Sequence, residues 1–153
     1  MPSLIAIDPG KSTGIIEGTY SENQPLEIMS KTVTHNGIQG FAEWYWEGVP
    51  FWSHEPIWIV EDFTLRGSND FVADLSGVEI IGFLKGMAIP VHWQSRTLKH
   101  LVPDLVLKHN GYWFTGKDVG HTDGRDCNDA AIHALAWLAK QKHEPTLRQL
   151  EKG

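Results

Sequence analysis

The sequence predicts an α/β fold in which a central mixed sheet of about five strands is flanked by helices. Two short runs, Leu4–Ile7 and Ile57–Val60, are apolar at every position, which is typical of strands covered on both faces. The segment Asp126–Lys140 is the clearest helix, because its alanine-rich middle has a high helix propensity. Strands come first along the chain and helices then alternate with strands, which is the order expected of an α/β sheet.

The remaining elements follow from similar patterns. Residues that favour extended chain predict three further strands, at Ile15–Thr19, Leu26–Thr34 and Ala88–Trp93. Helices are expected at Gly37–Trp46, Asp74–Met87 and Thr97–His109, the last of them interrupted at Pro103. We expect one domain over residues 1–143, followed by a polar, frayed tail over residues 144–153.

The composition is that of an acidic chain of 153 residues, with 13 Lys and Arg against 19 Asp and Glu. This balance argues against a protein that coats DNA through bulk positive charge, but it is compatible with a nuclease whose carboxylates hold cations. The single cysteine, Cys127, excludes an internal disulfide and a cysteine-rich zinc module. No apolar stretch approaches the ~20 residues of a membrane span, and Asp8 interrupts the first apolar run. We therefore expect a soluble, cytoplasmic protein without a signal peptide.

Two acids directly follow the apolar strands. Asp8 ends the first run and Glu61 ends the second. If these strands are neighbours in one sheet, both carboxylates emerge at the same edge, where open α/β sheets usually bind ligands. The alternative is that each acid merely begins a turn, for which the sequence Asp8-Pro9-Gly10 is well suited.

Two further carboxylates lie near the beginning of the last helix, for which Asp123 is the expected N-cap. Asp126 and Asp129 are spaced i, i+3 and share a helix face with His133. The other side of the helix is expected to pack against the sheet through Ala131, Ala134, Leu135 and Leu138. The alternative is that acids near a helix N-terminus only complement the macrodipole.

Four carboxylates that converged without a counter-charge would repel one another strongly. Hard oxygen ligands of this kind suit Mg²⁺ or Mn²⁺. Two such ions activate a water molecule and stabilise the leaving oxygen when a phosphodiester is displaced in line. The order of the acidic motifs along the chain suggests this convergence, although the composition alone does not.

Three segments resemble, in the same order, the motifs of RuvC-type Holliday junction resolvases. Ile7–Gly14 is similar to the opening motif of that family, and Val60–Phe63 is similar to its second acidic strand end. Arg125–Leu135 resembles its terminal acidic helix, most closely in members that phages encode, and a weaker likeness runs through residues 80–82 and 91–94. The tryptophan-rich stretch Trp44–Trp58 and the acidic balance depart from the family's pattern.

The resemblance implies an RNase H-like fold, a homodimer, and paired nicking of four-way DNA junctions with Mg²⁺, for which Mn²⁺ substitutes. Carried over position by position, Asp8 would bridge two metal ions and Glu61 would bind one of them. Asp126 and Asp129 would complete a catalytic, metal-binding set of four residues. Cleavage of other branched DNA stays open.

Other side chains are candidates for contacts around this site. His133 is expected either to orient Asp129 or to act on a phosphate, and a buried histidine bonded to backbone or water is an equal alternative. Phe63 is expected either to wedge against an unpaired base or to lie in the core. The basic candidates for DNA binding, each of which is alternatively an ordinary surface charge, are Lys11, Arg66, Arg96, Lys99, Lys108 and Arg125.

Two other functions compete with a junction-resolving nuclease. The first is a non-catalytic protein that keeps the fold and binds branched DNA, against which the four retained acids argue. The second is a nucleotide-binding protein that holds a phosphate in the loop Asp8–Gly14. Folds of that second kind need two such domains around the nucleotide, and this chain has the length of one.

Overall fold

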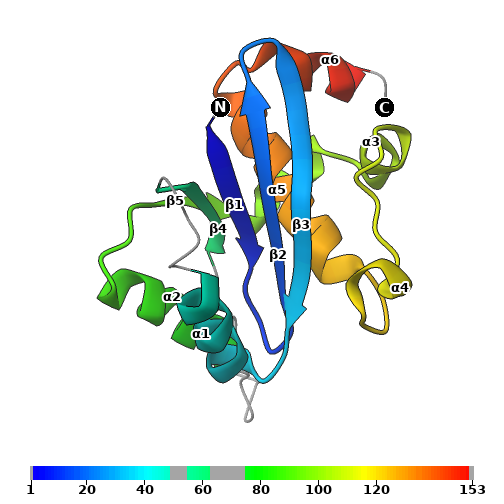
Figure 1. Ribbon diagram of the computed structural model, residues 1–153. Helices are drawn as coiled ribbons and strands as arrows, with labels where there is room; N and C mark the ends of the chain where they lie inside the picture. Colours follow the sequence, from blue (N-terminus) through cyan, green and yellow to red (C-terminus); the bar gives the residue numbers. More distant parts are fainter. Residues whose placement is uncertain (1, 49–54, 63–74, 152–153) are drawn as a thin grey trace.

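The computed structural model describes residues 2–48, 55–62 and 75–151, and within them a five-stranded mixed sheet forms the centre of the molecule (Figure 1). The strand order across the sheet is β3-β2-β1-β4-β5. β1 pairs antiparallel with β2 and parallel with β4, β2 pairs antiparallel with β3, and β4 pairs parallel with β5. The strands are β1 (Ser3–Asp8), β2 (Thr13–Ser21), β3 (Gln24–Thr34), β4 (Ile57–Asp62) and β5 (Val91–Ser95). The predicted mixed sheet of about five strands is confirmed.

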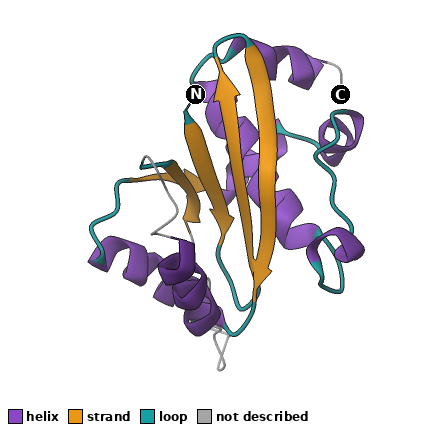
Figure 2. Ribbon diagram, viewed as in Figure 1, coloured by secondary structure: helices purple, strands orange, loops and turns teal. Residues whose placement is uncertain are grey.

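Helices cover both faces of this sheet (Figure 2). The long helix α5 (Arg125–Lys140) packs on one face, against β1, β2 and β4. The pair α1 (Gly37–Gly48) and α2 (Ser76–Gly86) packs on the other face. The shorter elements are the 3₁₀ helix η2 (Arg96–Leu101), α3 (Asp104–His109), α4 (Gly116–Val119) and α6 (Glu144–Glu151).

Successive side chains of the central strands point to opposite faces of the sheet, and this divides the hydrophobic core into two parts. In β1, Leu4 and Ala6 contribute to the core under α5, whereas Ile5 and Ile7 contribute to the core under α1 and α2. β4 divides in the same way, with Ile59 on the side of α5 and its neighbours Trp58 and Val60 on the other. Wholly apolar strands are needed because each face of the sheet lies beneath helices.

Helix α5 is buried on nearly all sides, so the expectation that it buries only one face is wrong. Every residue from Cys127 to Leu138 is buried except Asp129. The sheet covers one side, and the segment from Val102 to Phe114 contributes a second apolar layer to the same core. An alanine-rich helix suits this position, because small side chains let both layers approach closely.

Several boundaries differ from the sequence expectations. The strand predicted from Ala88 begins only at Val91, because Ala88 has a positive φ of 56°. The predicted break at Pro103 is confirmed, since η2 ends before it and α3 begins directly after it. Gly124 occupies the N-cap position of α5 in place of Asp123, whose Oδ1 still accepts a hydrogen bond from the Arg125 amide at 2.9 Å.

Residues 144–151 form helix α6, so the expectation of a frayed tail is wrong there. Pro145 and Thr146 are buried. His143 Nε2 lies 2.6 Å from the Ser21 carbonyl oxygen, and His143 Nδ1 lies 2.7 Å from Thr146 Oγ1. Since the carbonyl only accepts, Nε2 donates to it and Nδ1 accepts from the threonine hydroxyl. These bonds fix the beginning of α6 to the end of β2.

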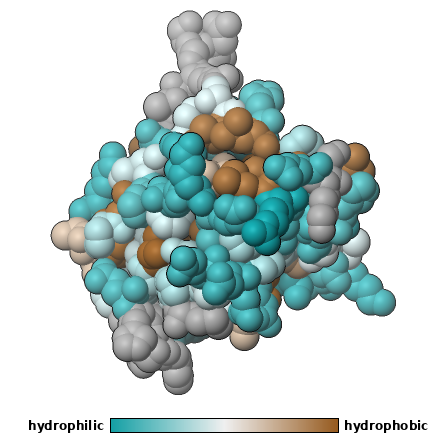
Figure 3. Space-filling view, turned by 90° about the horizontal axis from the view of Figure 1, so that it is seen from above, coloured by the Kyte–Doolittle hydropathy of each residue, from teal (hydrophilic) through white to brown (hydrophobic). Residues whose placement is uncertain are grey.

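Figure 3 shows the molecule from the α6 end, where the surface is mostly hydrophilic and hydrophobic side chains form small areas. Within residues 2–48, 55–62 and 75–151, no helix combines the length and the hydrophobicity that crossing a membrane would require.

Candidate active site

Four residues stand side by side across the sheet, one on each of four neighbouring strands. Asp8 of β1 is paired with Gly14 of β2, and Glu61 of β4 is paired with Gln94 of β5. The parallel register of β1 and β4 ends with Ile7 opposite Val60, so Asp8 and Glu61 come next on the two strands. Alternation places both carboxylates on the face that α5 covers. The prediction that the two strands are neighbours and carry their acids to one edge is confirmed.

Gly14 determines how closely α5 approaches this row. A Cβ atom built on Gly14 would lie 2.1 Å from both the carbonyl carbon and the carbonyl oxygen of Asp126. The turn before Gly14 is closed by Thr13, whose hydroxyl donates to the Gly10 carbonyl at 3.0 Å. The first turn of α5 therefore packs directly against the backbone of Gly14. This close approach brings Asp129 near Asp8 and Glu61.

Lys99 supplies the positive charge among the carboxylates. Its Nζ lies 3.0 Å from Glu61 Oε2 and 3.3 Å from Asp129 Oδ2. Arg125 Nη1 lies 3.6 Å from the other Asp129 oxygen, Oδ1. Lys99 reaches the cluster from η2, the turn that directly follows β5. The cluster of Asp8, Glu61, Asp129 and Lys99, which we call the acidic cluster, is thus drawn from four separate segments.

The pKa values of two acids in this cluster, Asp8 and Glu61, are shifted in opposite directions. Burial, together with the nearby charge of Glu61, raises the pKa of Asp8 well above its usual value. Burial also acts to raise the pKa of Glu61, but hydrogen bonds from His133, Asp8 and Lys99 outweigh it and hold that pKa at about 2. A raised pKa for Asp8 beside a lowered pKa for Glu61 is the pattern expected of two adjacent carboxyl groups in different surroundings.

His133 contacts Glu61 rather than Asp129, so the expectation that it orients Asp129 is wrong. Its Nε2 lies 3.0 Å from Glu61 Oε2. Its Nδ1 lies 3.1 Å from Nε2 of Gln94, and the same Gln94 nitrogen lies 2.8 Å from the His133 carbonyl oxygen. His133 and Gln94 are 0% and 2% exposed, so this chain of contacts is closed to solvent.

Asp126 lies next to the acidic cluster and is half-buried. Burial raises the pKa of Asp126, and the nearby charges of Asp123 and Asp129 add to this rise. His121 acts in the opposite direction and lowers that pKa, but by less than burial raises it. Asp126 also interacts electrostatically with Lys99. Of the four predicted metal ligands, Asp126 is thus the one that lies beside the acidic cluster.

The basic residues predicted to bind DNA separate into two groups. Lys99 and Arg125 touch acids of the cluster, and Arg125 Nη2 also lies 3.3 Å from Asp104 Oδ2. Lys11, Arg96 and Lys108 have exposed positions outside it. Phe63 and Arg66 lie outside the described residues.

Sequence reasoning did not identify Gln94 as a site residue, and it assigned Lys99 only to the DNA-facing surface. The only sequence signal for Gln94 was the weak family resemblance over residues 91–94, and its pairing with Glu61 is given by the structure. No comparable signal exists for Lys99, since the direction of its side chain depends on how the short 3₁₀ helix η2 follows β5.

The donors of the acidic cluster are carboxylate oxygens, which suit Mg²⁺ or Mn²⁺. Among the residues that the structure describes, no three His, Cys, Asp or Glu side chains are grouped so that they could hold one ion. The ammonium group of Lys99 contacts two of the acids, Glu61 and Asp129. The chemistry of the donors fits a divalent cation, provided that Lys99 moves aside.

Three solved structures resemble this one along nearly their full length. RuvC of Thermus thermophilus has a TM-score of 0.57 at 14% sequence identity, covering 92% of this chain and 97% of that one. T. thermophilus RuvC in complex with a Holliday junction substrate gives 0.56 at 13% identity, covering 91% and 96%. The Holliday junction resolvase of fowlpox virus gives 0.56 at 9% identity, covering 90% and 99%.

No protein-family model and no curated protein matches the sequence. The likeness in three dimensions nevertheless extends over at least 90% of the chain. The chain has the RNase H-like fold of RuvC-type Holliday junction resolvases, as the motif resemblance implied.

Proposed function

We propose that this protein is a metal-dependent DNA endonuclease that resolves Holliday junctions by paired nicking, of the kind that phages encode. The observation that carries the proposal is the convergence of Asp8, Glu61 and Asp129 on one face of a RuvC-type fold. Clustered carboxylates repel one another, and bound cations would relieve that repulsion.

Asp8, Glu61, Asp126 and Asp129 are the residues that would hold two Mg²⁺ ions, or Mn²⁺ in their place. Such ions would supply Lewis acidity to the water that attacks the phosphodiester and to the oxygen that leaves. Asp8 and Glu61 sit on neighbouring strand ends, which fixes their separation, while α5 brings Asp129 from above. The low pKa of Glu61 keeps that carboxylate ionised and ready to bind a cation.

Lys99 has a role that follows from its position. With no cation bound, its ammonium group pairs with both Glu61 and Asp129 and offsets part of their charge. Cations that take over this role would release the ammonium group toward a phosphate oxygen of the DNA. Lys99 would thus exchange a carboxylate partner for a phosphate partner at the same place.

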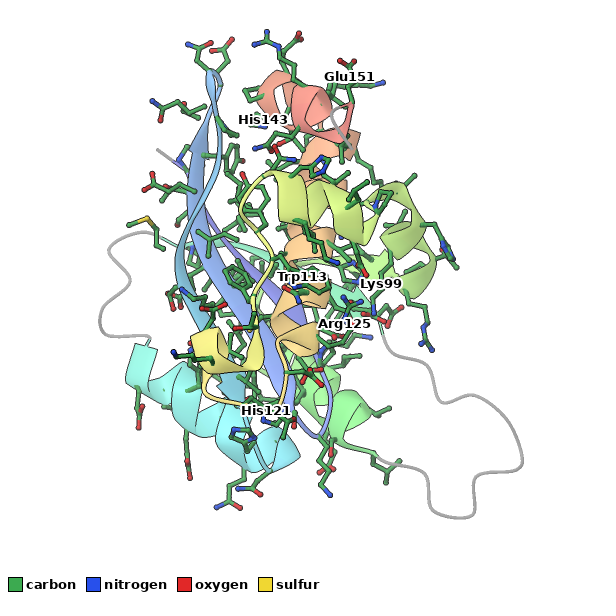
Figure 4. All side chains as sticks on the ribbon, turned by 90° about the vertical axis from the view of Figure 1, so that its right-hand side faces the viewer. Lys99, Trp113, His121, Arg125, His143 and Glu151 are labelled. Atoms are coloured by element: carbon green, nitrogen blue, oxygen red, sulfur yellow. The ribbon has the colours of Figure 1, made fainter. Side chains whose placement is uncertain are left out.

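A surface beside the acidic cluster is suited to the DNA backbone. In Figure 4, Lys99, Trp113 and Arg125 lie together beside the beginning of α5. The Trp113 ring is approached by Lys108 Nζ at 4.5 Å and by Arg125 Cζ at 5.1 Å from its centroid. Arg125 also borders two surface hollows of about 360 and 520 Å³, the first lined by Lys99 and Asp129 and the second by Trp113. We assign phosphate contacts to this surface.

A homodimer would give the two sites that paired nicking requires. At the beginning of helix α2, Leu75 and Val78 are exposed apolar side chains one turn apart on the same side. An apolar face of this kind is a suitable surface for a second copy of the chain. Light scattering of the wild-type protein and of Val78→Glu tests this, since a dimer that uses this face should dissociate in the variant.

The central experiment incubates purified protein with labelled four-way, three-way and linear DNA in low salt with Mg²⁺. Symmetric nicks in the four-way junction are expected, and nicks in the other branched form would extend the substrate range. Asp8→Asn should abolish cleavage and keep junction binding, because it removes a cation ligand without removing positive charge. Near-normal nicking by Asp8→Asn would contradict the mechanism.

One observation favours a second candidate function, that of a branched-DNA-binding protein without cleavage activity. Lys99 and Arg125 already place two positive charges against Glu61 and Asp129, so these carboxylates have cationic partners in the chain itself. The same gel experiment separates the two functions. A shifted but uncut junction in Mg²⁺ and in Mn²⁺ would identify the binding protein.

A further inference from the structure

Gln94, His133 and Glu61 form a buried chain of contacts that ends at the acidic cluster. Gln94 and Glu61 are register partners on β5 and β4, and His133 comes from α5, which packs above them. His133 is completely buried, and Gln94 and Glu61 are 2% and 5% exposed. Water does not reach the His133 ring, so the neighbouring protein groups determine which ring nitrogen carries the proton.

The orientation of the Gln94 amide is fixed by the His133 backbone. The carbonyl oxygen of His133 accepts hydrogen bonds only, and it lies 2.8 Å from one end of the Gln94 amide. That end must be the NH₂ group, since an amide oxygen in its place would set lone pair against lone pair. The cost of this orientation is that Gln94 Oε1 is buried without a partner among the described residues.

The fixed amide in turn determines the tautomer of His133. The same NH₂ group lies 3.1 Å from His133 Nδ1 and can only donate to it. Nδ1 is therefore the unprotonated, accepting nitrogen, and the ring proton is on Nε2. That N–H faces Glu61 Oε2 at 3.0 Å and donates to it.

We propose that Gln94 and His133 are positioning residues: Gln94 holds His133 in the Nε2–H tautomer, so that His133 is a permanent donor to Glu61. The donated bond fixes the Glu61 carboxylate in one orientation beside Asp8 and Lys99. Its consequence for cation binding rests on the proposed function. The tautomer itself does not, because it follows from contacts within the chain.

The tautomer is tested directly by NMR on the metal-free protein. Long-range ¹H–¹⁵N correlation distinguishes a protonated from an unprotonated ring nitrogen. We expect the His133 spectrum to show a protonated Nε2 and an unprotonated Nδ1, and we expect Gln94→Leu to show a mixture of both tautomers. A protonated Nδ1 in the wild-type protein, or an unchanged His133 spectrum in Gln94→Leu, would overturn the proposal while leaving the proposed nuclease function intact.

Positioning is tested by the Mn²⁺ affinity, measured by electron paramagnetic resonance. His133→Leu removes the donor and should weaken Mn²⁺ binding by about 10- to 100-fold, the usual effect of losing a group that orients a metal ligand. His133→Gln keeps a neutral N–H near the Nε2 position and should restore most of the affinity. Equal affinities in His133→Leu, His133→Gln and the wild type would overturn positioning.

A matched control is provided by His143, which bridges two groups far from the acidic cluster. His143→Gln should leave Mn²⁺ affinity unchanged even where it lowers the melting temperature. If His133→Leu does not fold, the comparison of His133→Gln and Gln94→Leu with the wild type decides the question. If the wild-type protein binds no Mn²⁺, the proposed function fails, and the NMR spectrum still tests the tautomer.

Discussion

Gly14 and Asp126 are in contact through their backbones, so that a single methyl group on Gly14 would come within 2.1 Å of the Asp126 carbonyl. Gly14 is also the register partner of Asp8. The same glycine therefore lies beside the first candidate ligand and under the helix that carries Asp126 and Asp129. This contact sets the distance between α5 and the strand ends.

Gly14→Ala should accordingly move the first turn of α5 away from the sheet. We expect a loss of about 1–3 kcal/mol in the free energy of unfolding, as for other overpacked sites, and a larger loss of cleavage per folded molecule. Urea unfolding and nicking of a labelled junction measure the two effects.

Gly18→Ala is the matched control for this substitution. Gly18 is also in β2, and its Cβ would lie 2.7 Å from the Glu27 carbonyl oxygen, away from the acids. It should destabilise the protein without a specific loss of cleavage per folded molecule. Equal effects of the two variants on cleavage would show that Gly14 has no special relation to the site.

The raised pKa of Asp8 predicts how stability depends on pH without divalent cations. Because the folded state binds the Asp8 proton more tightly than the unfolded state, this residue lowers stability as pH rises above the ordinary pKa of an aspartate. Asp8→Asn removes that loss. In EDTA, the variant should gain stability relative to the wild type between pH 4 and pH 8, as measured by urea unfolding at each pH. A constant difference across this range would mean that Asp8 is not perturbed.

Lys99→Met should destabilise the protein in the absence of metal ions. It removes the cation that lies 3.0 Å from Glu61 and 3.3 Å from Asp129, and leaves those acids facing each other. Since Lys99 is only partly buried, we expect a loss of about 1–3 kcal/mol. Thermal melts should also show a larger rise with Mg²⁺ in the variant than in the wild type, because the ion then supplies the missing charge. Melts in NaCl of equal ionic strength control for screening.

Lys108→Ala and Trp113→Ala should weaken junction binding without changing the cleavage rate at saturating protein. Lys108 lies against the Trp113 ring, so removing either side chain loosens the proposed phosphate contact. Lys108→Ala should reduce the slope of log affinity against log salt concentration by about 1. Lys142→Ala, at the opposite end of α5, should leave that slope unchanged. An unaltered slope in Lys108→Ala would remove the residue from the interface.

The strand ends could be predicted because their signal is local. A fully apolar run that stops at an acid indicates a strand covered on both faces and shows where that strand ends. Because side chains alternate between the two faces of a sheet, Asp8 and Glu61 then lie on the same face. Asp129 followed from helical spacing. The parallel pairing of β1 with β4 brings these residues together. The order of the motifs suggested that they converge, and the structure gives the pairing itself.

The contacts among these groups depended on tertiary packing and could not be predicted. His133 is one helical turn from Asp129, yet it bonds to Glu61, because the tilt of α5 over the sheet decides which acid its ring meets. The burial of α5 on both sides and the docking of α6 likewise arise from segments distant in sequence. The polar composition of α6 predicted an exposed segment, yet Pro145 and Thr146 are buried in the structure.

The position of α5 has a consequence for the protein during its synthesis. β1 is synthesised before the helix that covers its face, because that helix begins only at Arg125. Until that helix emerges, a nascent chain carries a bare apolar sheet face and an incomplete set of acids. We expect a chain that terminates before Arg125 to aggregate through this uncovered apolar face, and it would lack Asp126 and Asp129.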